Sequence, residues 1–462
     1  MESSRRHARP SEPAAELLTS LPAHLLDRIL NCLDLRDTVR TSALSRAWRR
    51  RWEALPYLSL SFLDNPGTPP VSVDSVLLRY PGHISHFSFK LDEHSVGRVA
   101  DWLIALCSRG VESINLQHSS ARAQAVFSGG FALHSSIFLC TQLVYLELHF
   151  CNIPPLPVGF IGFPVLEELK LDSAKFPENG ESQLESILGA SPLLNTLTLS
   201  FMHIQGDGSN EWVIRGPNLR SLTIICGATY GWRIADLPCL DEATIDLENY
   251  VNSGFEGFIA GLAQVRKLSL NTQYPLPPLT NGHLMEILPC TLNNLKSLSL
   301  WTHFCERPAI LSTLCLLMNA PNLEELDITI DRGENDEDKI EANAVYENTQ
   351  LTDAFCANLQ IVKIDDIGWL PNEMCFIELV LSRAILLLTM HLRLGCCISS
   401  KSNEDALCEL MTYRRASPHA QVFFNGGRDG WLYKNRVSCQ QNSNVRRNNF
   451  FNGDVSFESC WE

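Results

Sequence analysis

The sequence lacks the signals of a secreted or membrane-spanning protein. Residues 1–15 are polar and rich in Arg and Pro, without the apolar core of a secretory signal, and no Asn-X-Ser/Thr acceptor occurs in the 462 residues. The most apolar stretch, residues 375–394, is interrupted by Glu378 and Arg383, so it falls short of the roughly 20 apolar residues that cross a bilayer. We therefore expect no membrane contact and a location in the cytoplasm, the nucleus or both.

Basic charge is scarce, which argues against a nucleic-acid partner. Lys and Arg number 37 against 52 Asp and Glu, for a formal net charge of -15, whereas proteins that hold nucleic acid or anionic lipid need clustered Lys and Arg. The basic run at residues 49–51 is better interpreted as a solvated helix face than as a phosphate contact. We expect no nucleic-acid partner.

Recognisable catalytic and metal-binding motifs are also missing. The sequence contains no G-x-S-x-G, no Walker-type loop, no G-x-G-x-x-G after a strand and no H-E-x-x-H. The 16 cysteines show no metal-ligand spacing, and we expect them to be reduced core residues. The acidic run at residues 331–341 lacks EF-hand spacing and predicts a solvated loop. We predict a chain with no catalytic residue, metal or cofactor; a hydrolase with an unrecognised site stays open as an alternative.

What the sequence does contain begins with three short helical patterns between residues 17 and 56. The first helix is expected to open at Leu21, and its apolar residues recur at helical spacing as one stripe: Leu25, Leu26, Ile29, Leu30 and Leu33. The residues placed to cap the three helices are Ser20, Asp34 and Ser45. On the third helix, Trp48, Trp52 and Leu55 share a face, and Pro56 stops the helix.

These helices carry more apolar surface than they can cover themselves. A unit of about 40 residues cannot bury so many large apolar groups internally. Some of Leu25, Ile29, Val39 and Trp48 are therefore expected to contact a partner, although packing within a small three-helix unit is the plainer reading of the same stripe.

The same segment resembles the F-box of plant F-box/leucine-rich-repeat proteins. The resemblance lies in Leu21-Pro22, in Ile29-Leu30, in the Arg-Asp-x-Val-Arg-Thr-Ser stretch at residues 36–42 and in the Ser-Arg-x-Trp-Arg-x-x-Trp ending at residues 45–52. It implies docking on the Skp-type adaptor of a cullin–RING ubiquitin ligase. The positions that match the adaptor-facing residues of that family are Leu21, Pro22, Leu25, Ile29, Leu30, Val39, Arg40, Ser45 and Trp48. His24 and Ala47 depart from the usual acidic and basic residues at their positions.

A repeated pattern fills the middle of the chain. The motif L-x-x-L-x-L recurs seven times, and with the weaker copies included the spacing is roughly 21 to 36 residues, which brackets and sometimes exceeds that of standard leucine-rich repeats. The clear copies begin at Leu143, Leu166, Leu194, Leu219, Val265, Leu295 and Leu323. Weaker copies begin at Ile84, Val111, Leu240 and Leu359. Since one such strand cannot bury its apolar face alone, the pattern predicts strands stacked in a parallel sheet, as a solenoid.

The residues between the leucines point to the opposite, concave face of such a sheet. We predict that target-binding residues lie there, because this is the surface on which a leucine-rich-repeat protein binds its ligand. The candidates are Tyr145, Glu147, Glu168, Lys170, Thr198, Ser269, Ser299 and Trp301. Tyr145 and Trp301 stand out as aromatics in a polar field, although each could instead pack on a neighbouring loop.

The C-terminal part follows a different order. Residues 359–424 predict strand–helix–strand–helix–strand, and with the Ser-Pro-x-Ala sequence at residues 417–420 they resemble the FBD region of plant F-box proteins. Its expected role is to cap the last repeat and its open sheet edge. Residues 1–16 and 425–462 have the composition of disordered segments.

These features combine into one α/β architecture with a binding function. We predict an N-terminal three-helix F-box (17–56), a leucine-rich repeat solenoid with a parallel β-sheet horseshoe (57–358), an FBD-like cap (359–424) and disordered ends. The predicted function is that of a non-catalytic substrate receptor of a Skp–cullin–F-box ligase, which binds the adaptor, through it the cullin, and an unknown target protein. The alternative is a non-ligase interaction scaffold, in which Leu25, Ile29 and Trp48 would be buried.

Overall fold

The computed structural model describes residues 21–425 apart from 45, 47, 64–67, 119–129, 205–210, 227–230, 236, 248–254, 272–287, 289, 306, 332–354 and 396–400. The segments predicted to be disordered, apart from Asn425 of the second one, lie outside this part of the chain, as do the predicted caps Ser20 and Ser45 and most of the acidic run at residues 331–341.

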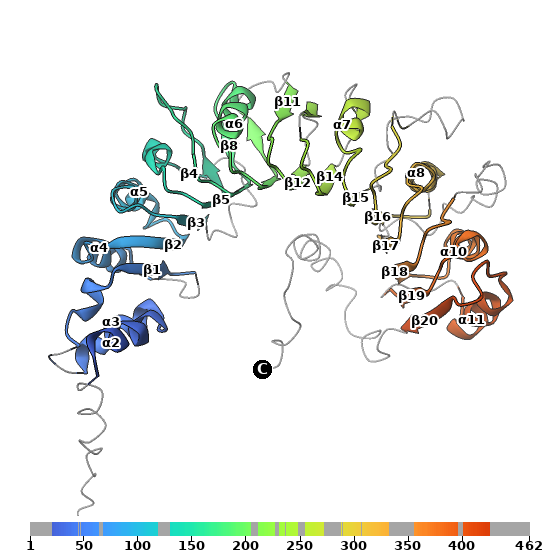
Figure 1. Ribbon diagram of the computed structural model, residues 1–462, viewed down its shortest axis with the longest axis horizontal. Helices are drawn as coiled ribbons and strands as arrows, with labels where there is room; N and C mark the ends of the chain where they lie inside the picture. Colours follow the sequence, from blue (N-terminus) through green and yellow to red (C-terminus); the bar gives the residue numbers. More distant parts are fainter. Residues whose placement is uncertain are drawn as a thin grey trace, which may run out of the picture.

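The main sheet is a long arc of 14 strands, all parallel, and it confirms the predicted solenoid (Figure 1). Neighbouring strands are in the order β1-β2-β3-β5-β7-β9-β12-β14-β15-β16-β17-β18-β19-β20. Their bounds are β1 Tyr57–Ser61, β2 His83–Leu91, β3 Ser113–His118, β5 Tyr145–His149, β7 Glu168–Asp172, β9 Thr196–Ser200, β12 Ser221–Cys226, β14 Glu242–Leu247, β15 Lys267–Asn271, β16 Ser297–Thr302, β17 Glu325–Ile330, β18 Ile361–Ile367, β19 Thr389–Leu394 and β20 Gln421–Asn425.

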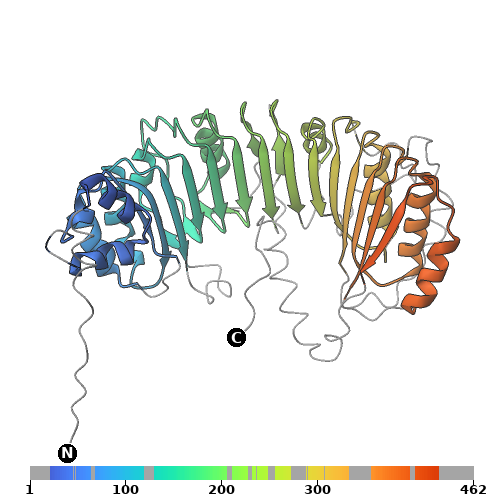
Figure 2. The ribbon, with the colours of Figure 1, turned by 60° about the horizontal axis from the view of Figure 1, so that its bottom comes forward.

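Helices cover the outer, convex side of the arc, and the strands line its inner side (Figures 1 and 2). The α-helices there are α4 Pro70–Arg79, α5 Val99–Cys107, α6 Gly180–Gly189, α7 Phe255–Gly261, α8 Arg307–Met318, α10 Pro371–Arg383 and α11 Asn403–Thr412, and the 3-10 helices η3 Val96–Arg98 and η5 Ser135–Leu139 supplement them. This arrangement buries one face of the sheet and leaves the other open.

The leucine pattern accounts for the stacking. In β7, Leu169 and Leu171 are 2% and 3% exposed. The residues that alternate with them, Glu168, Lys170 and Asp172, are half-buried on the open face. The backbone adds a ladder at the start of each strand: the carbonyl oxygen of Glu167 accepts from Asn195 N at 2.9 Å and from Thr196 N at 3.0 Å. The same bifurcated contact recurs from strand to strand, so each repeat fixes the register of the next.

Three non-glycine residues turn the chain sharply out of the sheet. Phe150, Ser173 and Phe201 have φ of 53°, 51° and 49° and stand at the ends of β5, β7 and β9. The left-handed conformation costs free energy in residues other than glycine. At each of these three positions the backbone N–H donates to a carbonyl oxygen of the next strand, as Ser173 N does to Ser200 O at 2.8 Å.

The chain then forms short strands on the convex side that the sequence did not predict. One small sheet has the order β10-β8-β6-β4 and another pairs β11 with β13. Their bounds are β4 Phe131–Ala132, β6 Cys151–Asn152, β8 Lys175–Phe176, β10 His203–Ile204, β11 Glu211–Ile214 and β13 Gly231–Ile234.

The N-terminal module is helical, with one correction. It contains α2 Ala23–Asn31, α3 Leu35–Arg40, and the 3-10 helices η1 Thr41–Ala43 and η2 Arg51–Ala54. The predicted third helix is present only as the short 3-10 helix η2, because Arg50, directly before it, adopts the left-handed conformation (φ 61°). Trp48, Trp52 and Leu55 are nevertheless all buried, each 3% exposed. The first helix begins two residues later than predicted, after Pro22.

The C-terminal segment has the predicted order of elements, and it extends the sheet. Strands β18, β19 and β20 continue the parallel array, and α10 and α11 cover their convex side. Glu373, 1% exposed, fixes the start of α10 by accepting from Gly368 N at 2.9 Å and Leu370 N at 3.0 Å. Within the described residues, no strand pairs with the outer edge of β20, so the segment prolongs the solenoid without closing its edge.

One pair of cysteines differs from the expectation that all are reduced. Cys107 of α5 and Cys140, just after η5, form a disulfide with 4.8 Å between their Cα atoms. The two lie 33 residues apart, and the stacking of two successive repeats brings them together. Among the described cysteines, free thiols are found at Cys32, Cys151, Cys239, Cys290, Cys356 and Cys408.

Candidate functional site

The apolar stripe of the N-terminal module divides into two sides. Leu26 and Leu30 face inward, at 4% and 1% exposure, and pack with the buried tryptophans. Leu25 and Ile29 stay half-buried on the other side of α2. Leu33 and Leu44 are 38% and 60% exposed. The module therefore keeps part of its apolar surface in contact with solvent.

Polar contacts hold this surface in place. Asp34 caps α3 by accepting from Asp37 N at 2.7 Å, as the sequence predicted. Thr38 Oγ1 donates to Leu30 O at 3.1 Å and thereby fastens α3 to the end of α2. Arg51 pairs with Asp27 across the module at 2.8 Å. α2 and α3 are thus fixed relative to each other before any partner arrives.

The nine predicted adaptor-facing residues fall into three groups. Leu21, Leu25, Ile29 and Val39 are half-buried, and Pro22 and Arg40 are exposed. Leu30 and Trp48 are buried in the module itself, so in this conformation they support the surface without reaching a partner. Ser45 lies outside the described residues. The nine predicted adaptor-facing residues do not include Leu33 and Leu44, which are exposed apolar residues of the same module. Helical spacing from Leu26 and Leu30 already placed Leu33 on the stripe.

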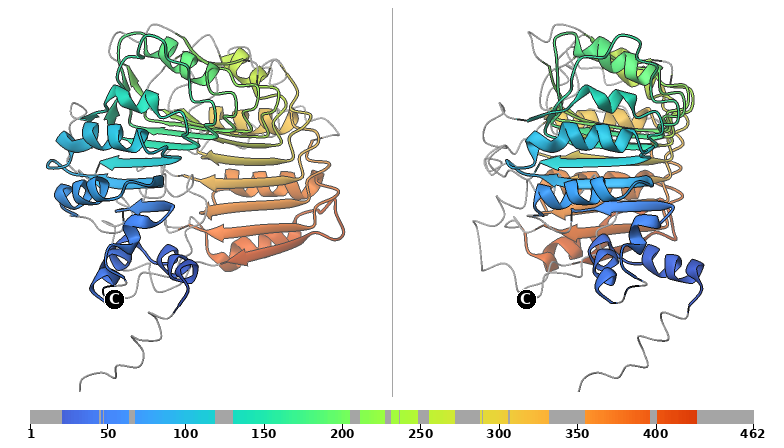
Figure 3. Two further views of the ribbon diagram at one scale, coloured as in Figure 1. Left: turned by 60° about the vertical axis from the view of Figure 1, so that its left-hand side comes forward. Right: turned by 90° about the vertical axis from the view of Figure 1, so that its left-hand side faces the viewer.

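The eight predicted target-facing residues all lie half-buried on the concave face. Five of them share one row across the sheet, since register pairs Glu147 with Lys170 and Lys170 with Thr198, and further along Ser269 with Ser299. Tyr145 pairs with Glu168 in the row before, and Trp301 lies in the row after. Figure 2 shows the open face of these strands, and Figure 3 shows the array from its N-terminal side. Only the residues of β5 and β7 form a contiguous cluster.

That cluster is a network of polar side chains centred on Glu147. Tyr145 Oη donates to Glu147 Oε2 at 2.5 Å, His149 Nε2 lies 2.7 Å from Glu147 Oε1, and Asn115 of β3 also donates to this carboxylate. Lys170 Nζ is 2.7 Å from Glu168 and lies 5.4 Å from the centre of the Tyr145 ring. A rigid, partly desolvated polar patch results.

The network sets the charges within it. Burial opposes the charged form of His149, but hydrogen bonds to Asp172 and Glu147 outweigh it and raise the pKa of His149 to about 9. Burial raises the pKa of Glu147, and the hydrogen bonds from His149 and Tyr145 outweigh it, so this pKa is lowered. Burial and the Glu147 hydrogen bond raise the pKa of Tyr145. At neutral pH the patch presents an imidazolium between two carboxylates.

A second polar region on the concave face was missed by the sequence reading. Asp327, Lys363 and His391 follow one another across β17, β18 and β19, and Arg393 pairs with Asp365 at 2.5 Å in the next row. Burial, followed by repulsion from Asp365, raises the pKa of Asp327. Extending the leucine alternation through the copies at Leu323 and Leu359 would have identified these positions.

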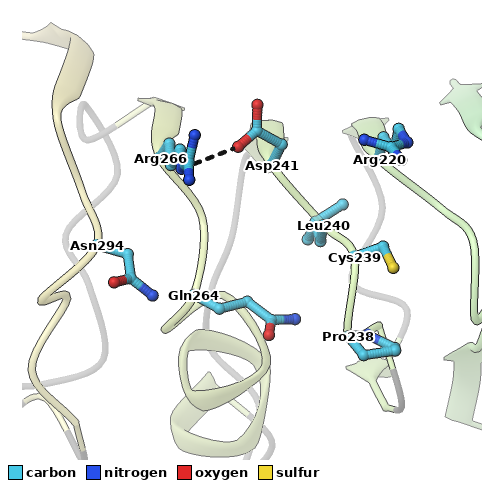
Figure 4. A pocket seen from close by; sticks show the side chains of 8 residues that line it. All are labelled: Arg220, Pro238, Cys239, Leu240, Asp241, Gln264, Arg266 and Asn294. Carbon is cyan, nitrogen blue, oxygen red and sulfur yellow. Dashed lines mark ion pairs between the residues drawn. The ribbon is translucent and has the colours of Figure 1, made fainter.

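The rim of the sheet carries a shallow, polar hollow beside β12, β14 and β15 (Figure 4). Arg220, Asp241 and Arg266 line it in consecutive repeats, and Arg266 Nε is 3.5 Å from Asp241. These side chains show no nucleophile–base pair. Within the described residues, no group of three or more His, Cys, Asp or Glu could hold a metal ion. No helix in the described part of the chain is long and apolar enough to span a membrane.

Two family models match segments of this chain. The F-box domain model matches residues 18–59. A model described as the LRR repeats of the FBD-associated F-box protein At5g56370 matches residues 99–255. The F-box/FBD/LRR-repeat protein At1g13570 of Arabidopsis thaliana is 26% identical over 446 residues, which cover 88% of this chain and 98% of that protein. The chain is therefore similar to plant F-box/leucine-rich-repeat proteins with an FBD region, and its residues 18–59 match the F-box domain.

A second relative covers much of the same length. The F-box/LRR-repeat protein At4g14103 of Arabidopsis thaliana is 26% identical, over 67% of this chain and 91% of that protein. F-box/leucine-rich-repeat proteins are in general non-catalytic substrate adaptors, and an F-box implies binding to a Skp-type adaptor. The residues that match the F-box model, 18–59, contain the helical module whose apolar stripe of Leu25, Ile29 and Val39 is half-buried.

Proposed function

We propose that this chain is the substrate-recognition subunit of a Skp–cullin–F-box ubiquitin ligase. Its F-box docks on the adaptor and, through it, the cullin. The concave face of the repeats binds the target. The chain then acts by proximity, because holding the target near the loaded E2 raises the local concentration of its lysines.

The observation that carries the docking step is the partly exposed stripe of Leu25, Ile29 and Val39, of which Ile29 and Val39 also pack in part against the core, on a module that matches the F-box model. Burying such side chains against another protein gains roughly 25 cal/mol per Å² of apolar surface. The scaffold alternative predicts that Leu25, Ile29 and Trp48 are all buried. Trp48 is buried within the F-box module, whereas Leu25 and Ile29 are only partly buried.

Binding of a purified Skp-type adaptor to the full chain tests the docking step. We expect the double variant Leu21→Ala/Pro22→Ala to weaken adaptor binding, while Leu78→Ala, on an 84% exposed residue of α4, leaves it unchanged. Adaptor binding that is absent in the wild type, or indifferent to the double substitution, contradicts the docking step.

The target-binding step needs its own test, in cells of the source tissue. A target is a protein whose ubiquitination rises with the wild-type chain. The ubiquitination of this target should not rise with the Leu21→Ala/Pro22→Ala variant or with Lys170→Glu on the concave face. The matched control is Lys175→Glu, on the convex strand β8, which should leave ubiquitination intact. Equal loss with both lysine variants would contradict recognition by the concave face.

A further inference from the structure

The two ends of the main sheet differ in how their outer strands are covered. β20 pairs in parallel with β19 on one edge, and within the described residues no strand pairs with its other edge. At the opposite end, α3 of the F-box contacts β1, and Asn31 Nδ2 donates to Tyr57 Oη at 3.3 Å. Figures 1 and 2 show the F-box beyond β1 at one end of the arc and β20, with α11, at the other end. An open edge is a template for a further strand.

The composition of β20 favours pairing. Natural edge strands are usually blunted by lysine, proline or a bulge, whereas β20 reads Gln-Val-Phe-Phe-Asn, with no charge and no proline. Phe423 is 45% exposed and stacks on His391 with 4.9 Å between ring centres. Met411 of the adjoining helix α11 is 79% exposed. Apolar surface therefore accompanies the open backbone edge.

The hydrogen-bond phase of β20 shows which backbone groups are open. Gln421 N donates to Leu388 O at 2.9 Å, so the backbone groups of Gln421 point toward β19. Because these groups alternate along a strand, those of Phe423 and Asn425 point the same way. The N–H and C=O groups of Val422 and Phe424 point outward.

We propose that two copies of this chain associate through β20, antiparallel and centred on Phe423. In this register Val422 lies opposite Phe424 of the second copy, and each such pair exchanges two hydrogen bonds. Both outward-facing residues of each strand are then fully paired. Phe423 lies on the two-fold axis at a non-hydrogen-bonded position, where side chains are closest, and faces Phe423 of the second copy.

A second copy is complementary to this edge. Gln421 meets Asn425, so amide faces amide at both ends of the pairing, and no like charges oppose each other. A strand with no charged residue offers nothing that would select a partner of opposite charge. Isologous pairing of this kind is the commonest route to a closed dimer.

The dimer joins the two arcs into one continuous sheet. Its F-boxes lie at the two far ends, since each F-box is at the opposite end of its own sheet from β20 (Figure 1). Two concave faces and two adaptor-docking modules then act in one assembly, which raises the effective affinity for a target with two binding segments.

Sedimentation equilibrium of the full chain tests the association. Val422→Pro removes an outward N–H and exchanges one partly buried side chain for another; edge strands tolerate proline, so the melting temperature should stay close to that of the wild type. We expect the wild type to dimerise reversibly and the variant to associate at least about tenfold more weakly, which is about 1.4 kcal/mol. Leu78→Lys, on the exposed face of α4, should dimerise like the wild type.

A cross-link tests the register. In the proposed dimer the two Cα atoms at position 423 are about 4.5 Å apart, within the span of a disulfide. With oxidised glutathione as the oxidant, Phe423→Cys should form a 423–423 link between copies, identified by peptide mass spectrometry. Gln421→Cys, which faces position 425, should form no 421–421 link.

Two results would overturn the dimer. The first is a wild type that stays monomeric at every concentration, which follows if residues 426–462 of the same chain bind the edge. The second is a dimer that persists in Val422→Pro and gives no 423–423 link. Loss of adaptor binding changes neither readout, so the dimer and the ligase function succeed or fail separately.

Discussion

The repeat array and the F-box place their apolar side chains in opposite ways. In the array, Leu197 and Leu222 are completely buried, because each repeat has neighbours that cover its apolar face. In the F-box, Leu25 and Ile29 stay half-buried, and Leu44 is 60% exposed. A module of about 40 residues cannot cover such a stripe alone. The difference teaches that the array uses its leucines for folding, while the F-box keeps some of its leucines for another protein.

The largest effect is expected in the core of the array. Leu298→Ala, at a completely buried residue of β16, should lower the free energy of unfolding by about 2–5 kcal/mol, because it leaves a cavity. Ser299→Ala on the open face of the same strand should change it by less than about 0.5 kcal/mol. Urea unfolding followed by circular dichroism measures both. Equal effects would break the contrast between the two faces of the sheet.

The next effect concerns the polar network on the concave face. The pKa of His149, about 9 in the folded chain, lies above its unfolded value of about 6.5. Its stabilisation is therefore complete below pH 6.5 and is lost as the pH rises to about 9. Relative to His149→Gln, the wild type should lose stability over this interval with a slope of up to about 1.4 kcal/mol per pH unit.

Thermal unfolding at pH 6, 7.5 and 9 supplies this comparison. Both proteins contain every other titrating group, so their difference isolates His149. A difference that is constant with pH, or that grows with rising pH, would contradict the ion pairing of His149 with Glu147 and Asp172.

A smaller effect is expected at the F-box cap. Asp34→Ala removes the acceptor for Asp37 N and should cost about 0.5–2 kcal/mol of stability. Asp34→Asn keeps an acceptor and should cost less. Hydrogen exchange of the α3 amides reports the change locally. Exchange that accelerates equally in both variants would argue against the cap as the cause.

The smallest effect belongs to the ion pairs along the rim. Lys296 lies 2.6 Å from Glu324, and both side chains are more than 40% exposed. Lys296→Ala should change stability by less than about 1 kcal/mol, with a part that disappears in salt. Thermal unfolding at low and high salt measures this change. A loss of stability larger than about 1 kcal/mol would mean that the ion pairs of the rim contribute more to stability than an exposed pair is expected to.

Periodicity in the sequence predicted most of this architecture. The spacing of L-x-x-L-x-L predicted the parallel strands and their two faces, since both follow from the two-residue period of a strand. It could not predict the left-handed turns at Phe150, Ser173 and Phe201, because no glycine marks them. The small convex sheets depend on these turns and were missed for the same reason.

The sequence predicted the face on which the candidate site residues lie better than it predicted how deeply each side chain is buried. All eight concave residues lie on the expected face. In the F-box, a helical stripe does not reveal which of its sides is covered, so Leu30 and Ile29 could not be told apart until the positions of Trp48 and Trp52 were known. The Cys107–Cys140 disulfide depends on the stacking of two repeats, which sequence spacing does not convey.

Adaptor affinity of the full chain, measured by calorimetry, tests the central claim most directly. Ile29→Asp places a charge on the half-exposed stripe of the F-box, and Ile104→Asp places one on a 52% exposed residue of α5 in the array. We predict that the first loses at least about tenfold in affinity, as expected for a hot spot worth more than 1 kcal/mol, and that the second binds like the wild type. Equal affinities for the two variants would contradict the assignment of this stripe to the adaptor.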